Sequence, residues 1–198
     1  MTTFLLIRHG HTSWVGKALA GHLPGVALSA SGHEQAENLV RRLHGTSVSA
    51  VYSSPLQRTL ETAAPLARSI GVTVIQRPRL IEINFGDWTG RTISELAADE
   101  GWNRFNALRS ITRIPNGDLM LDVQARMVDE LMELHQAHPN QTVAIFSHQD
   151  TIKAALAHFL GISLDNFLRF QVDPVAISTV QIAEGGARVL TLNSTGAL

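Results

Sequence analysis

Short β-like runs alternate with amphipathic segments along most of the chain, and this alternation restricts the folds that it can adopt. Residues 3–7, 49–53 and 142–147 form three such runs, each short enough for one strand. Residues 31–44 carry apolar side chains spaced i, i+3, i+4 and i+7, which is the period of a helix. We therefore predict an α/β protein, a three-layer sandwich in which helices cover both faces of a mostly parallel central sheet.

The same patterns predict the remaining elements. Ser31 and Glu34 fit a capping box for the first helix. Ser54 fits the N-cap of a second helix that ends at Gly71. Further elements are expected at residues 72–76 (strand), 120–138 (long helix), 152–160 (helix) and, as a C-terminal β-hairpin, 176–183 with 187–193. The buried face expected for the second helix consists of Leu60, Ala63, Ala64, Ala67 and Ile70.

Length and composition bound the rest of the architecture. We predict a single domain over residues 1–198, with a lid region of loops and two short helices at about 77–117, where glycine and proline recur. The net charge of -1 favours neither nucleic acid nor an anionic membrane as a partner. No run approaches the ~20 apolar residues of a membrane span, and the N-terminus does not resemble a signal peptide. We expect a cytoplasmic protein, with a homodimer as the candidate assembly.

The chain contains no cysteine. A thiolate nucleophile, a disulfide framework and a cysteine zinc site are therefore excluded. We expect neither a cofactor nor a metal ion.

Polar clusters follow three of the predicted strands directly. They are residues 8–11, 53–58 and 147–150. Ligands of open α/β sheets bind outside the carboxyl ends of the strands. If these strands are parallel neighbours, the clusters converge on one site that contains Arg8, His9, Arg58 and His148.

These side chains suit a phosphoryl group. Two guanidiniums match phosphate oxygens, one imidazole can attack phosphorus, and a second imidazole can donate a hydrogen bond. Glu82 lies between two isoleucines, and an apolar setting can raise the pKa of a carboxyl group until it serves as a proton donor. Each residue taken alone is more often structural, so the argument depends on their joint placement.

Four segments resemble the motifs of the histidine phosphatase superfamily, whose fold is that of phosphoglycerate mutase. They are residues 6–12 (LIRHGHT), 52–63 (YSSPLQRTLETA), 80–90 (LIEINFGDWTG) and 146–148 (FSH). The resemblance implies that His9 is the nucleophile that becomes phosphohistidine, and that Glu82 is the proton donor. It also implies that Arg8, Arg58 and His148 bind the phosphoryl group. The further substrate-binding residues expected are Thr12, Gly21, His22 and Gln149.

The chain departs from the family pattern at several positions. His11 stands in place of the usual Glu, and Thr89 in place of the Glu of Trp-Glu-Gly. Val15 stands where many members have an Asn that contacts phosphate, and Gln149 and Asp150 replace a glycine-rich pair. Substrate choice is therefore expected to be unusual, although the central residues are all present.

The implied function is hydrolysis of a phosphomonoester on a small phosphorylated metabolite. Family mutases usually read Glu-Arg-His-Tyr-Gly where residues 82–86 read EINFG, which favours a phosphatase over a phosphoglycerate mutase. A non-catalytic protein that binds a phosphorylated ligand is a third alternative. A metallohydrolase built on His9 and His11 lacks a second ligand cluster, and the spacing of Gly10, Gly16 and Lys17 is not that of a P-loop. Residues that could reach the leaving group are His22, Asn84, Arg104, Arg109 and Arg113.

Overall fold

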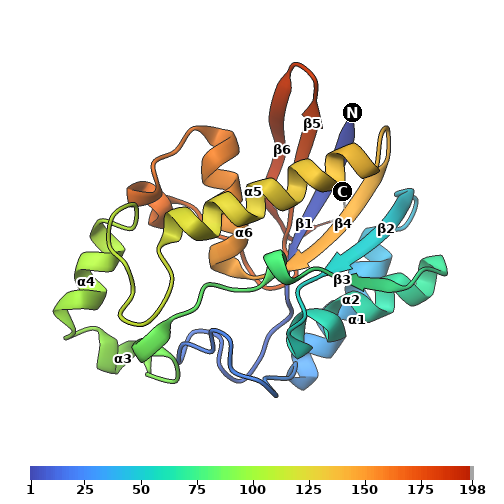
Figure 1. The fold of residues 1–198 in the computed structure, drawn as a ribbon. Helices are drawn as coiled ribbons and strands as arrows, with labels where there is room; N and C mark the ends of the chain where they lie inside the picture. Colours follow the sequence, from blue (N-terminus) through green and yellow to red (C-terminus); the bar gives the residue numbers. More distant parts are fainter. Residues whose placement is uncertain (197–198) are drawn as a thin grey trace.

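The computed structural model describes residues 1–196, which form an α/β sandwich (Figure 1). Its sheet has the strand order β3-β2-β4-β1-β5-β6. β1, β4, β2 and β3 run parallel, whereas β5 and β6 are antiparallel to their neighbours and form the predicted hairpin. The strands are β1 Thr2–Arg8, β2 Val48–Ser53, β3 Val74–Gln76, β4 Thr142–Ser147, β5 Ile177–Ala183 and β6 Gly186–Ser194. The helices are α1 Ala30–Arg42, α2 Gln57–Ile70, α3 Ile93–Leu96, α4 Glu100–Ala107, α5 Met120–Ala137 and α6 Gln149–Leu160, with 3-10 turns η1 Pro78–Leu80, η2 Gly86–Trp88 and η3 Leu164–Arg169.

Strand β1 explains the three layers. Its side chains point alternately to the two faces of the sheet, as the geometry of a strand requires. Phe4 and Leu6 pack with α5 and α6, which cross one face, and Leu5 and Ile7 pack with α1 and α2 on the other (Figure 1). A strand buried on both faces must be apolar throughout, which is why residues 3–7 read as a continuous run. The predicted three-layer arrangement is confirmed.

The register of the central strands places the polar clusters side by side. Arg8 is opposite Ser147, and Ser53 is opposite Phe146. The pairing continues one residue past the strand ends, because the amide of His9 donates to the carbonyl oxygen of Ser147 at 3.0 Å. On the other side of β4, the amide of Ser54 donates to the carbonyl oxygen of Phe146 at 2.9 Å. The three predicted clusters therefore meet at one edge of the sheet.

Both predicted helix starts are wrong. Helix α1 begins earlier than expected, and its N-cap is Ser29, whose Oγ accepts from the amide of Gly32. Helix α2 begins only at Gln57, and no side chain caps it. Ser54 cannot be its N-cap because the backbone there is still paired with β4.

The predicted buried face of α2 is wrong in part. Leu60, Ala64 and Ile70 are only half-buried, whereas Thr59, Thr62 and Leu66 are buried in addition to Ala63 and Ala67. Thr62 explains why the observed buried face of α2 differs from the predicted one, because its Oγ1 accepts from the amide of Gly10 at 2.9 Å. The helix thus turns a polar edge toward the loop that follows β1.

Residues 77–117 contain the two short helices that were predicted, α3 and α4, and in addition the turns η1 and η2. The segment has a core of its own, in which Phe85, Trp88 and Phe105 pack against α6 and η3. It lies beyond the carboxyl ends of β1, β2 and β4 (Figure 1). Whether it acts as a lid stays a prediction.

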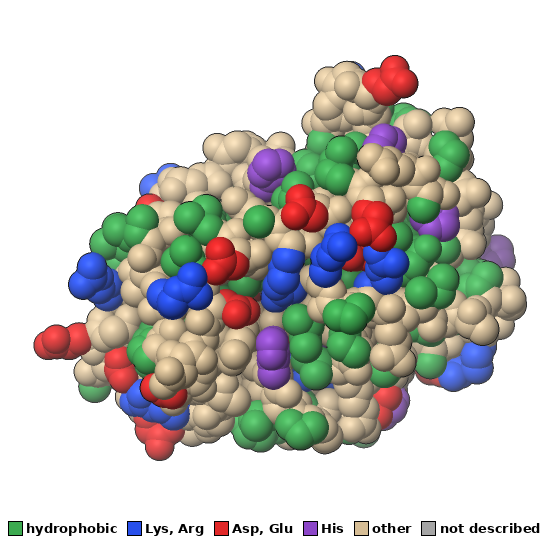
Figure 2. Space-filling view, in the orientation of Figure 1, with side chains coloured by type: hydrophobic (Ala, Val, Ile, Leu, Met, Phe, Trp, Pro, Cys, Tyr) green, Lys and Arg blue, Asp and Glu red, His purple; other side chains and the backbone are tan. Residues whose placement is uncertain are grey.

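Charges of both signs are mixed on the face shown in Figure 2. Near the start of η1, Arg77 pairs with Glu130 of α5, and Arg79 pairs with Glu133 of α5. No helix among the described residues is long and apolar enough to cross a membrane.

Candidate active site

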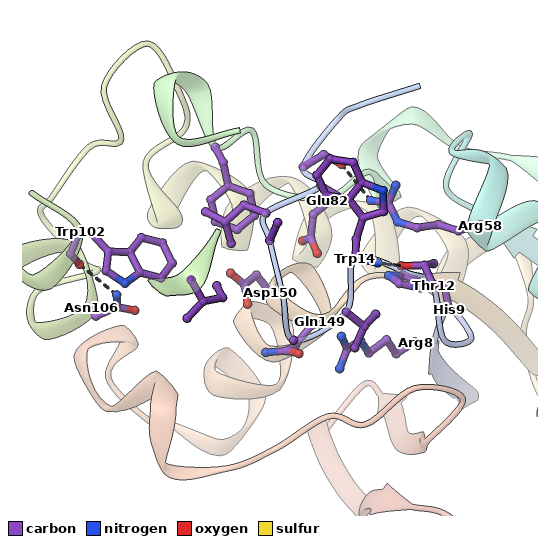
Figure 3. Close-up of a pocket in the computed structure, with 18 of the residues that line it drawn as sticks. Arg8, His9, Thr12, Trp14, Arg58, Glu82, Trp102, Asn106, Gln149 and Asp150 are labelled. Carbon is purple, nitrogen blue, oxygen red and sulfur yellow. Dashed lines mark hydrogen bonds between the residues drawn. The ribbon is translucent and has the colours of Figure 1, made fainter. Parts of the chain in front are cut away.

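A cavity of about 290 Å³ opens at the carboxyl ends of the parallel strands (Figure 3). One end is polar and is lined by Arg8, His9, Arg58 and Glu82, which come from three separate segments of the chain. The other end is wider and largely aromatic or apolar. The residues that line the wider part include Trp14, Val15, Phe85, Trp102, Asn106, Arg109, Gln149, Asp150 and Leu168.

His9 is buried at the polar end. Its Nδ1 lies 2.8 Å from the carbonyl oxygen of Gly10. A carbonyl oxygen only accepts, so Nδ1 carries the proton and Nε2 holds a free electron pair. Burial lowers the pKa of His9 well below its ordinary value, and the positive charges of Arg58 and Arg8 lower it further. The imidazole is therefore neutral at physiological pH, which is the state that a nucleophile requires.

Arg8 and Arg58 are each anchored by one hydrogen bond. Arg8 Nη1 donates to the carbonyl oxygen of Val172 at 2.8 Å, and Arg58 Nη2 donates to that of Gly21 at 2.8 Å. Arg8 Nε and Arg58 Nη1 are buried and have no hydrogen-bond partner among the described residues. Two fixed guanidiniums with unused donors suit an anion with several oxygens.

His148 lies behind His9. The centroids of the two rings are 5.3 Å apart, and His148 is fully buried. Its Nε2 lies 2.8 Å from Ser54 Oγ, while its Nδ1 has no partner among the described residues. Burial lowers the pKa of His148 well below its ordinary value, and the positive charge of Arg58 lowers it further. A neutral ring whose Nε2 accepts from Ser54 has a proton on Nδ1 and can donate it in a hydrogen bond.

Glu82 points into the cavity between Arg58 and Asp150 (Figure 3). Its Oε1 accepts from the amide of Ile83 at 3.0 Å and from Thr151 Oγ1 at 3.2 Å. Burial, and then the neighbouring charge of Asp150, raise the pKa of Glu82 to about 7. A carboxyl group with this pKa can both give and take a proton near neutral pH.

The structure divides the other predicted residues into two groups. Thr12, Gly21 and Gln149 line the cavity. His22 is not among the lining residues, and its Nε2 lies 2.6 Å from the carbonyl oxygen of Glu82. Of the residues considered for the leaving group, only Arg109 lines the cavity, and Arg113 instead pairs with Asp122 at the surface.

Arg109 and Asp150 form a charged pair in the wider part, which the sequence did not indicate. The Arg109 guanidinium carbon lies 4.4 Å from the ring centroids of both Phe105 and Phe167. Its Nη2 donates to Asn106 Oδ1 at 2.6 Å, and its Nη1 lies 3.5 Å from Asp150 Oδ2. In the sequence, Asp150 appeared only as a departure from the family pattern, and no sequence signal joined it to an arginine in the loop after α4.

The comparisons with known proteins agree with this geometry. The model of the histidine phosphatase superfamily (branch 1) matches residues 4–195. The chain belongs to this superfamily. It is a metal-independent histidine phosphatase, and its activity is the hydrolysis of phosphomonoesters.

Two curated relatives and one solved structure illustrate the similarity. Phosphoserine phosphatase 1 of Hydrogenobacter thermophilus is 30% identical and covers 98% of this chain and 93% of its own length. Adenosylcobalamin/alpha-ribazole phosphatase of Escherichia coli is 32% identical, over 96% of this chain and 94% of that protein. A phosphoserine phosphatase of Entamoeba histolytica, solved in complex with phosphoserine, superposes with a TM-score of 0.88 at 28% identity, covering 98% of each chain.

Proposed function

We propose that His9 carries the phosphoryl group and that Arg8, Arg58 and His148 bind its oxygens. The observation that carries this proposal is the set of buried donors without partners. Among the described residues, Arg8 Nε, Arg58 Nη1 and His148 Nδ1 are three of the five buried side-chain polar atoms that lack a partner. Such atoms are costly unless a ligand satisfies them, and all three belong to residues around Nε2 of His9.

The reaction that we propose has two displacements. Nε2 of His9 attacks phosphorus while the bond from phosphorus to the leaving oxygen breaks, and the proton of Glu82 passes to that oxygen. The alcohol leaves. The Glu82 carboxylate then takes a proton from water, whose oxygen attacks phosphorus as the bond to Nε2 breaks. Phosphate leaves, and Glu82 is again protonated.

Substitution of His9 tests these roles. His9→Ala should abolish hydrolysis of a phosphomonoester panel and the acid-labile ³²P label that the parent retains after rapid quenching. His33→Ala is the matched control, because His33 is an exposed histidine of α1. Binding of phosphorylated ligands without turnover by the parent would favour the non-catalytic alternative, and isomerisation of 3-phosphoglycerate would favour the mutase.

For the substrate, we propose a small phosphorylated metabolite whose leaving group carries both an ammonium and a carboxylate. Arg109 is held rigid between two phenyl rings, and its Nε has no partner among the described residues. Asp150 makes one long contact with it, so both charges can still bind a ligand. A carboxylate fits the guanidinium and an ammonium fits Asp150. Two proteins similar to this chain are named as phosphoserine phosphatases, which supports the same class.

Four substrates separate the two charges. O-phosphoserine carries both groups, 3-phosphoglycerate only the carboxylate, O-phosphoethanolamine only the ammonium, and glycerol phosphate neither. We expect kcat/KM to be highest for O-phosphoserine and lowest for glycerol phosphate. Equal kcat/KM for all four, or a preference for alpha-ribazole phosphate, would refute the substrate class but not the reaction.

A further inference from the structure

The segment that carries Glu82 belongs to neither a helix nor a strand. It joins η1 to η2, so no regular hydrogen-bond ladder fixes the backbone of Glu82. A proton donor must lie within hydrogen-bond reach of the leaving oxygen, and an error of about 1 Å can cost about 100-fold in rate. Contacts from outside the segment must therefore hold it in place.

One side chain of α5 makes three hydrogen bonds to the backbone of residues 79–82. Arg126 Nη1 donates to the carbonyl oxygens of Arg79 at 2.6 Å and Ile81 at 2.7 Å. Its Nη2 donates to the carbonyl oxygen of Glu82 at 2.9 Å. One guanidinium thus bridges three carbonyl groups within four residues. Only a planar fork with several donors can do this, and a lysine ammonium at the end of a flexible chain cannot reproduce it.

Two further groups donate hydrogen bonds to the same carbonyl oxygens. His22 Nε2 lies 2.6 Å from the carbonyl oxygen of Glu82, so that nitrogen must carry a proton. Thr151 Oγ1 donates to the carbonyl oxygen of Ile81 at 2.9 Å. Arg126 does not line the cavity. Its contacts act on the backbone of Glu82 and not on the substrate.

We propose that Arg126 is a positioning residue that holds Glu82 at the leaving-group oxygen. This inference rests on the proposed role of Glu82 as the proton donor. It explains how a segment without secondary structure can present a carboxyl group in one place, between Arg58 and Asp150 (Figure 3).

The test compares two kinds of leaving group in Arg126→Lys and Arg126→Gln. A 2,4-dinitrophenolate leaves without a proton, whereas the alkoxide of glycerol phosphate needs one. We expect kcat/KM for glycerol phosphate to fall by about 10- to 100-fold, since general acid catalysis contributes roughly 10²- to 10⁴-fold. We expect kcat/KM for 2,4-dinitrophenyl phosphate, which does not include the hydrolysis of phosphohistidine, and the inhibition constant of vanadate to change less than about threefold.

Two comparisons make the result decisive. Arg68→Lys is the control, because the Arg68 guanidinium pairs with Glu37 at the surface, away from the segment of Glu82. Glu82→Gln should show the same dependence on the leaving group, and its absence there would refute the role of Glu82 itself. If Glu82→Gln shows that dependence while both Arg126 variants lose the two activities equally, or lose neither, positioning by Arg126 is refuted. Thermal unfolding of each variant identifies loss of folded protein, and the lysine variant keeps the charge.

Discussion

Asp150 should set the upper pH limit of activity through its charge. The pKa of Glu82 is raised from 4.5 to about 7, with burial as the larger cause and Asp150 as the next. At 1.36 kcal/mol per pKa unit, the whole rise corresponds to about 3 kcal/mol. Because the negative charge of Asp150 is one of the two causes that raise this pKa, Asp150→Asn should lower the pKa of Glu82, by about one unit.

The assay follows kcat/KM against pH for glycerol phosphate, which carries no charged group for Asp150 to bind. Phosphate monoesters lose their second proton near pH 6, so the alkaline limb is the informative one. Activity requires protonated Glu82, and the parent should therefore lose activity as pH rises through about 7. In Asp150→Asn the alkaline limb should occur at lower pH. At pH values above the limb, kcat/KM of this variant should be up to about tenfold below that of the parent.

Asp129→Asn is the matched control, because it removes an exposed carboxylate of α5 that lies outside the cavity. The alkaline limb of the pH profile of Asp129→Asn should coincide with that of the parent. A limb in Asp150→Asn that is unmoved, or that moves to higher pH, would show that the charge of Asp150 does not act on the proton donor.

Three further predictions concern stability and phosphate binding. Gly32→Ala should destabilise the protein by about 1–3 kcal/mol in urea unfolding, because a Cβ there would lie 2.1 Å from the carbonyl oxygen of His11, whereas Gly185→Ala, with nothing within 4 Å, should not. Glu82→Gln should match the parent below pH 4.5, where Glu82 is protonated in both folded and unfolded chains; above about pH 7 it should be more stable by up to about 3 kcal/mol, since the parent must then bury a charge. Val15→Asn should bind inorganic phosphate about fivefold more tightly by one added hydrogen bond, and an unchanged inhibition constant would exclude that contact.

Periodicity predicted the fold because the sheet determines most of the apolar pattern. Strand β4 and the end of α2 at Gly71 occur where they were expected, since a buried strand and a left-handed glycine leave clear signals. The start of α2 failed for a long-range reason. Ser54 has the composition of a helix cap, but its amide is paired with β4 and its hydroxyl lies against His148.

The same contrast holds for the site. Arg8 and His148 could be placed because they directly follow strands whose ends meet at one edge of the sheet. Arg126 could not, since its three contacts are to backbone carbonyl groups, which have no sequence signature. Arg109 was a candidate for contact with the leaving group, but its pairing with Asp150 escaped prediction, because this contact joins segments 41 residues apart.

The pairing of β1 has a consequence for how the protein is made. Thr3 pairs with Thr142 on one side and with Gln181 on the other, so β1 is synthesised long before either of its neighbours in the sheet. At about 5–20 residues per second, β1 waits for roughly 10–35 seconds before β5 has been synthesised. Such non-local pairing slows folding. We therefore expect His9 to join Arg58 and Glu82 late in folding, and recovery of phosphatase activity during refolding should report the docking of β1.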